Sequence, residues 1–121
     1  MKRSFEGYTF ALWDYYEGHQ SLLIRSPKGG NQDHNIDLIF RGVEYVAVPS
    51  VLKDLILDEP TKSDRKFIEG ILGELPQHDH VYVLVADSYR HFVVAVALKI
   101  TEHNEGIYET PFEKPPPGYS I

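Results

Sequence analysis

The sequence predicts an α+β domain, in which a mostly antiparallel sheet of five to seven strands carries one or two short helices. Three observations lead to this fold class. Short apolar runs alternate with polar residues along most of the chain, turn-forming residues separate the runs, and one stretch has the apolar spacing of a helix. The length of 121 residues fits a single domain, expected over residues 1–110, followed by a proline-rich tail over residues 111–121.

The predicted centre of the sheet is the stretch from Ile36 to Val48, in which two β-rich runs meet at Arg41-Gly42. Glycine readily takes the positive φ that a tight hairpin requires. The pattern therefore predicts a hairpin whose two strands pair across this turn. Its register would set three apolar residues before the turn opposite three after it, namely Ile36, Leu38 and Phe40 opposite Val43, Tyr45 and Ala47.

Other apolar runs predict further strands at residues 8–16, 21–25, 81–86 and 92–100, and a last edge strand at residues 107–109. A surface loop is expected at residues 26–34, which are rich in turn formers. The run 92–100 is nonpolar on both faces, which is typical of a strand covered on both sides or buried at a subunit contact.

Two helices are expected. Residues 63–74 carry one apolar stripe at helical spacing and follow the capping candidates Thr61 and Ser63. Residues 51–57 have the pattern of a short helix capped by Ser50, although the same run also suits a brief strand. The helical interpretation is the one we adopt for residues 51–57.

Composition limits the classes of function. The chain has no cysteine, which excludes disulfides, thiolate metal sites and thiol catalysis and suits a reducing compartment. No apolar run has the length of a membrane span and no signal peptide is visible, so we expect a cytoplasmic protein. The net charge of −6, without a lysine or arginine cluster, argues against nucleic acid or a membrane as partner. It suits a basic protein partner, but it also simply favours solubility.

The residues most typical of a metal site are His78-Asp79-His80, because side chains two apart on a strand share a face and imidazole binds transition metals. Two imidazoles do not complete a site. A further ligand would have to come from a carboxylate or another histidine, and the sequence places none there; the remaining histidines are His19, His34, His91 and His103. We therefore assign no metal ligand and no cofactor.

Two other motifs have residue types found in enzymes. Asp87, Ser88 and His91 could supply a nucleophile and a base, but they fall in a predicted hairpin turn and no nucleophile elbow surrounds them. Lys28-Gly29-Gly30 is basic and glycine-rich but lacks the remainder of a phosphate-binding loop. We interpret both motifs as turns and assign no catalytic residue.

Two aromatic features could bind a partner. Trp13, Tyr15 and Tyr16 could line a groove, although packing in the core or at an edge is the commoner role of such residues. Pro116-Pro117-Gly118-Tyr119 matches the Pro-Pro-x-Tyr pattern that WW domains bind as polyproline II.

The run from Leu38 to Tyr45, together with Val93-Val94-Ala95, resembles small bacterial sheet-based proteins of uncharacterised function, including immunity proteins of polymorphic toxin systems. The resemblance implies a domain that binds a protein partner. Our first hypothesis is thus a non-enzymatic protein-binding domain, with toxin neutralisation as its sharpest form. The alternatives are a metal-dependent hydrolase using His78 and His80, and a structural module in which strand 92–100 forms a homodimer.

Overall fold

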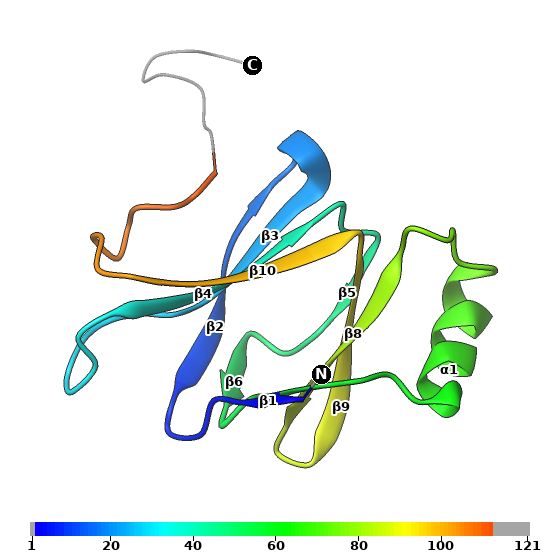
Figure 1. The fold of residues 1–121 in the computed structure, drawn as a ribbon, viewed down its shortest axis with the longest axis horizontal. Helices are drawn as coiled ribbons and strands as arrows, with labels where there is room; N and C mark the ends of the chain where they lie inside the picture. Colours follow the sequence, from blue (N-terminus) through cyan, green and yellow to red (C-terminus); the bar gives the residue numbers. More distant parts are fainter. Residues whose placement is uncertain (1, 113–121) are drawn as a thin grey trace.

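The computed structural model describes residues 2–112 and confirms the α+β class. Its described part contains ten strands, which form two antiparallel sheets of five, and one α-helix (Figure 1). Sheet I has the strand order β1-β7-β8-β9-β5 and sheet II the order β10-β4-β3-β2-β6. The strands are β1 (Arg3–Ser4), β2 (Thr9–Tyr16), β3 (Ser21–Ser26), β4 (Asn35–Arg41), β5 (Tyr45–Ala47), β6 (Val51–Lys53), β7 (Ile56–Asp58), β8 (His80–Ala86), β9 (Tyr89–Ala95) and β10 (Ala97–His103).

The main core fills the space between the two sheets. Alternate residues of each strand face it, as the period of two in the sequence predicts. Sheet II contributes Ile24, Leu38 and Phe40, while sheet I contributes Leu84 and Val93, and all five side chains are fully buried. This burial of apolar area is the main stabilising term of the fold.

The predicted hairpin between residues 36 and 48 is wrong. Both strands exist, but β4 pairs with β3 and β10 in sheet II, whereas β5 pairs with β9 in sheet I. The turn at Gly42, with φ +64°, therefore carries the chain from one sheet to the other. The amide of Val96, at the bend between β9 and β10, donates to the carbonyl of Arg41 at 3.0 Å, so both crossings share one corner.

The predicted helix at residues 63–74 is confirmed as α1 (Lys62–Leu72). Thr61 caps it: its hydroxyl accepts from the amide of Asp64, while the Asp64 carboxylate accepts from the amide of Thr61. Ile68 is fully buried and packs with Val83 and Phe92 on the face of sheet I that points away from sheet II. Sheet I is therefore covered on both faces, as the apolar character of residues 92–95 led us to expect. The single strand predicted over residues 92–100 is wrong, because the chain bends at Val96 and continues as β10 in sheet II.

Two predicted elements are wrong. Residues 51–57 form no helix but the two short strands β6 and β7, separated at Asp54 by a positive φ of 52°. Pairing with β2, β1 and β8 outweighs the weak helical tendency of this run. Residues 107–109 form a turn rather than an edge strand, and the carbonyls of Ile107 and Glu109 accept hydrogen bonds from Arg25.

Candidate binding cleft

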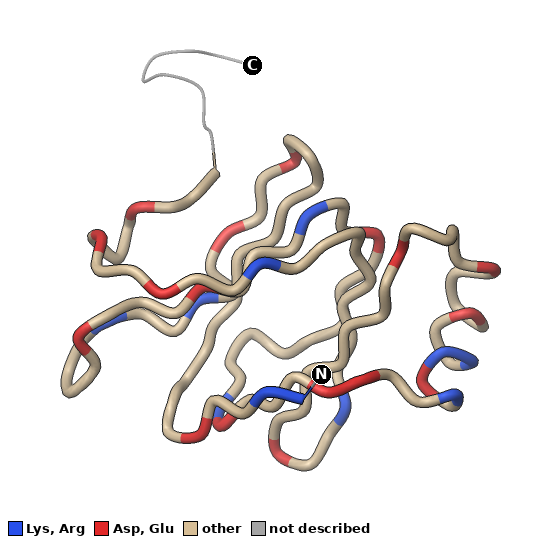
Figure 2. The backbone as a smooth tube through the Cα atoms, viewed as in Figure 1, with Lys and Arg blue, Asp and Glu red and all other residues tan. Residues whose placement is uncertain are grey.

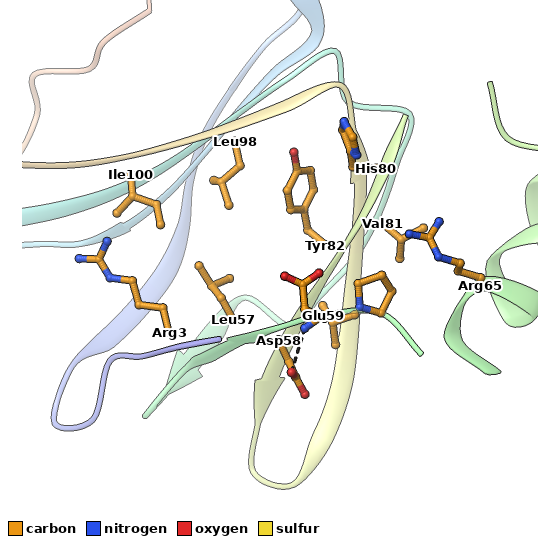
Figure 3. A pocket seen from close by; sticks show the side chains of 12 residues that line it. Arg3, Leu57, Asp58, Glu59, Arg65, His80, Val81, Tyr82, Leu98 and Ile100 are labelled. Carbon is orange, nitrogen blue, oxygen red and sulfur yellow. Dashed lines mark hydrogen bonds between the residues drawn. The ribbon is translucent and has the colours of Figure 1, made fainter. Parts of the chain in front are cut away.

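A cleft of about 260 Å³ opens between the two sheets, where β10 of sheet II faces β1, β7 and β8 of sheet I (Figure 3). Leu57, Tyr82, Leu98 and Ile100 line its middle, with charged side chains around them. An apolar floor with a few charged groups at its margin is the usual composition of a binding site. The complete lining is Arg3, Leu57, Asp58, Glu59, Pro60, Arg65, His80, Val81, Tyr82, Val83, Leu98 and Ile100.

One edge of β8 faces this cleft. The amide of Glu44 donates to the carbonyl of Val94 at 2.7 Å, so the backbone groups of Val94 point toward β5. Because backbone direction alternates along a strand, the groups of Val93 point toward β8, where Tyr82 is the paired residue. The N–H and C=O of Val81, next to Tyr82, therefore point to the other edge of β8, away from β9.

On that edge β7 ends too early to reach Val81. The last pair between the two strands is Asp58 with Val83, so the next hydrogen-bonded pair in this register would join Pro60 to Val81. Proline has no N–H to donate, and it is disfavoured inside a sheet for that reason. No backbone group of the described residues bonds Val81 on this side, although the residue is only 3% exposed.

Arg90 of β9 holds the segment that leaves β7. Its guanidinium donates to Asp64 at 2.6 Å, to Asp58 at 3.1 Å and to the carbonyl of Glu59 at 3.2 Å. The hydrogen bond from Arg90 is the main cause that lowers the pKa of Asp64, and the same pair raises the pKa of Arg90. These contacts fix residues 58–64 in a path toward α1 and away from the edge of β8.

Some charged residues of the cleft form ion pairs within the chain, as Asp58 does with Arg90, whereas two arginines do not. Arg3 lies over the ring of Phe5 at 4.9 Å, and neither Arg3 nor Arg65 forms an ion pair with any described residue. Burial raises the pKa of Tyr82. In Figure 3, Arg65 lies beside Val81 at one end of the cleft and Arg3 lies near Ile100 at the other. The cleft thus presents cations at both ends.

A second charged group is buried on the outer face of sheet II. Arg25 donates to both carboxylate oxygens of Asp37, at 2.6 and 2.9 Å, and His103 lies 2.7 Å from the same carboxylate. Arg25 also donates to the carbonyls of Ile107 and Glu109, at 2.8 and 2.7 Å. Since both oxygens of Asp37 and the donors of Arg25 are used within the chain, the group attaches the segment after β10 to the sheet.

The predicted histidine pair does not form a metal site in the structure described for residues 2–112. Only His80 belongs to β8; His78 lies in the preceding turn, and its Nε2 is 3.7 Å from the buried carboxylate of Asp79. No group of three or more metal-ligating side chains gathers within the described residues. His80 instead lines the cleft, with its ring 6.1 Å from that of Tyr82.

The other predicted motifs also fall in turns and loops. Asp87 and Ser88, both with positive φ, make the two-residue turn between β8 and β9, and His91 lies within β9. Lys28 is in a loop and its ammonium donates to the carbonyl of Asn104 at 3.0 Å. The Pro116-Pro117-Gly118-Tyr119 motif lies outside the described residues.

The aromatic group of β2 is divided between two faces. A bulge between Leu12 and Asp14 shifts the register, so Trp13 and Tyr16 pack with Phe112 on the outer face of sheet II. Tyr15 does not share this face and is 51% exposed. Regular alternation along β2 would place Trp13 and Tyr15 on the same face, but the inserted residue reverses the alternation and separates them, so the three aromatic residues do not line one groove.

Comparisons with protein-family models, with curated proteins and with solved structures find no match for this chain. Within residues 2–112, the structure has no helix with the length and apolarity needed to cross a membrane. The candidate site therefore depends on the geometry of the chain itself.

Apart from His80, which the sequence suggested as part of a metal site, the residues of the cleft were missed from the sequence. One signal was present: Pro60 follows a strand-like run and removes a donor exactly where a longer β7 would need one. Recognising it requires the register between β7 and β8, which joins residues more than 20 positions apart and is not visible in local patterns.

Proposed function

We propose that this protein is a non-enzymatic binding domain for another protein, and that the cleft between β8 and β10 receives part of that partner. The observation that supports the proposal is the apolar surface of the cleft, to which Leu57, Tyr82 and Leu98 contribute. An apolar cleft with a few charged groups at its margin is a common binding site. Neutralisation of a toxin, the role implied by the resemblance, is the sharpest form of this proposal, and a cytoplasmic location stays a prediction.

The charges near the cleft differ from the negative charge of the chain as a whole. Three basic residues lie in the first turns of α1, namely Lys62, Arg65 and Lys66 (Figure 2). The segment that follows β10 instead carries the acidic residues Glu105 and Glu109. Complementary charges on a partner speed encounter and fix its orientation. A partner that binds in the cleft would thus meet positive charge from the start of α1, although the chain as a whole is negative.

The alternatives have less support. The apolar run 92–100, which suggested a homodimer, is divided between the two sheets, and its β9 part is covered by α1 on one face and by sheet II on the other, so that part needs no second copy. The hydrolase hypothesis stays a prediction without a specific observation in its favour. Neither alternative accounts for the apolar cleft between the two sheets.

The test is to isolate a partner and measure its affinity for cleft variants. The tagged full chain would be used to capture proteins from the source cell, and a captured protein would be purified and titrated by calorimetry. We expect Leu98→Asn and Arg65→Glu to weaken binding, because both side chains line the cleft. The matched control is Val51→Asn, at an exposed position of β6 outside the cleft, which should bind like the wild type. Failure to reconstitute any complex, or equal affinity for all variants, would contradict the proposal.

A further inference from the structure

We infer that the cleft holds one aromatic side chain of the partner, and that acidic residues on either side of this side chain bind Arg3 and Arg65. This inference rests on the proposed function, because it names the part of a partner that the cleft would bind. Three features of the cleft support it: its size, its apolar middle and the arginines at its two ends.

The volume of the cleft suits a side chain rather than a cofactor. It measures about 260 Å³, whereas pockets that enclose a drug-sized ligand have volumes of roughly 300–1,000 Å³. The side chains of Tyr82, Leu98 and Ile100 pack against the main core but stay partly exposed. A side chain that enters between the sheets can therefore reach them without displacing any strand.

The middle of the cleft is apolar and includes an aromatic ring. Tyr82 of β8 lines it together with Leu98 and Ile100 of β10 (Figure 3). On the core side, the fully buried Phe40 makes a T-shaped contact with Tyr82, with the ring centroids 5.5 Å apart. Because Tyr82 is partly exposed, it can contact a second ring from the cleft. Such a contact would add to the stabilisation that burial of apolar area provides.

The arginines of the lining lack ion pairs, whereas its carboxylates have partners. Asp58 is bonded by Arg90, and Glu59 also has an interaction partner in the chain. Arg3 and Arg65 lie at opposite ends of the cleft and form no ion pair with any described residue (Figure 3). Carboxylates beside the aromatic side chain would bind these guanidinium groups, whereas lysines would be repelled. The segment that enters the cleft is thus acidic, although the net charge of −6 alone would favour a basic partner.

The experiment uses the full chain labelled with ¹⁵N and the peptide acetyl-Glu-Ala-Phe-Ala-Glu-amide, titrated into the millimolar range at about 0.15 M salt. We expect the amide signals of Tyr82, Leu98 and Ile100 to shift most. A peptide with leucine in place of phenylalanine should bind about twofold to tenfold more weakly, because it loses the ring contact. A peptide with alanine there should bind at least about tenfold more weakly. A peptide with lysine in place of both glutamates should bind about twofold to fivefold more weakly than the original.

Matched variants of the chain test the two kinds of contact. Leu98→Asn should weaken binding of the phenylalanine peptide, because Leu98 lines the cleft. Arg3→Glu and Arg65→Glu should each reduce the preference for the glutamate peptide over the lysine peptide. The control is Lys99→Glu, since Lys99 is an exposed cation of β10 that pairs with Ile39 on the outer face of sheet II. That variant should leave the preference nearly unchanged.

The outcomes separate this inference from the proposed function. Absence of shifts at Tyr82 and Leu98, equal binding of the phenylalanine and alanine peptides, or an unchanged preference in both arginine variants would each overturn the inference. Tighter binding of free phenylacetate than of the peptide would assign the cleft to a small molecule and would likewise overturn it. A partner that binds through the cleft while these peptides do not would refute the aromatic and acidic segment alone. Peptide binding without any protein partner would refute the proposed function alone.

Discussion

Gly42 and Val96 meet at the corner where the chain passes twice between the sheets. The amide of Val96 lies 3.2 Å from the carbonyl oxygen of Gly42, and a Cβ built on Gly42 would come within 2.7 Å of Cγ2 of Val96. Gly42 also has a φ of +64°. Glycine is therefore required here twice, by the backbone conformation and by the closeness of the other crossing.

Gly42→Ala should lower the free energy of unfolding by about 2–4 kcal/mol, which combines left-handed strain with overpacking. Gly30→Ala is the matched control, since Gly30 has a φ of +55° but no atom within 4 Å of the added Cβ. That control should cost only about 1–2 kcal/mol. Urea denaturation of the three proteins measures the difference, and equal losses would show that the contact with Val96 carries no cost.

Asp37→Ala should destabilise the fold by about 3–5 kcal/mol, because it leaves the fully buried Arg25 without its carboxylate. The double variant Arg25→Met with Asp37→Leu should lose less than Asp37→Ala, since it leaves no buried charge uncompensated. Denaturant titration of both proteins checks this order. A double variant less stable than the single one would mean that the pair contributes net stability that apolar packing cannot replace.

Arg90→Met should lower the stability by about 1–2 kcal/mol, a moderate value because the Arg90 side chain is 34% exposed. The loss should appear first as faster hydrogen exchange at the start of α1, where Asp64 loses its partner. Lys99→Met, at an exposed position of β10, is the control and should change little. An unchanged exchange rate in Arg90→Met would show that the capping box alone holds the helix start.

His34 contributes to the stability of the fold, and the direction in which this contribution changes with pH follows from its pKa. The hydrogen bond that His34 Nδ1 donates to the carboxylate of Asp33, at 2.7 Å, raises the pKa of His34, and Glu102 at 2.9 Å adds a mainly coulombic attraction. Because the pKa of His34 is higher in the folded state than in the unfolded state, its stabilising contribution is fully present at a pH below the pKa of the unfolded state. The contribution is lost as the pH rises through the pKa of the folded state. The difference in Tm between wild type and His34→Asn should therefore be larger at pH 5.5 than at pH 8.5.

The control for this titration is Asp33→Asn, which removes the largest cause of the shift. In that background the His34→Asn difference should depend less on pH. The T-shaped contact between the rings of Tyr8 and His34, at 6.4 Å between centroids, does not involve Asp33 and should persist in Asp33→Asn. A difference that grows with rising pH would contradict the assigned sign.

Local patterns in the sequence were sufficient for most elements but not for their pairing. The helix over residues 63–74 was predictable from Thr61 and the apolar stripe, because caps and periodicity are local. The turn at Gly42 was also predictable, but its strands pair with segments far along the chain, and a glycine turn does not specify that partner. Residues 51–57 were misjudged for the same reason, since distant strands decide their conformation.

The cleft depends on such distant relationships. Arg90 and Asp64 hold the chain off the edge of β8, and they are 26 residues apart in the sequence. The unpaired position at Val81 follows from where β7 ends, which only the register with β8 reveals. Residue types alone drew attention to His78 and His80, whose spacing resembles a metal site, whereas the structure places only His80 at the cleft.

Calorimetric titration of a captured partner against the wild type, Leu98→Asn and Val51→Asn tests the central claim most directly, because the proposal requires that the partner binds in the cleft. Leu98 lines the cleft, whereas Val51 is exposed on β6 outside it. We predict that Leu98→Asn binds the partner more weakly than the wild type and that Val51→Asn binds it equally well. Equal affinity of all three proteins for the partner would contradict the account.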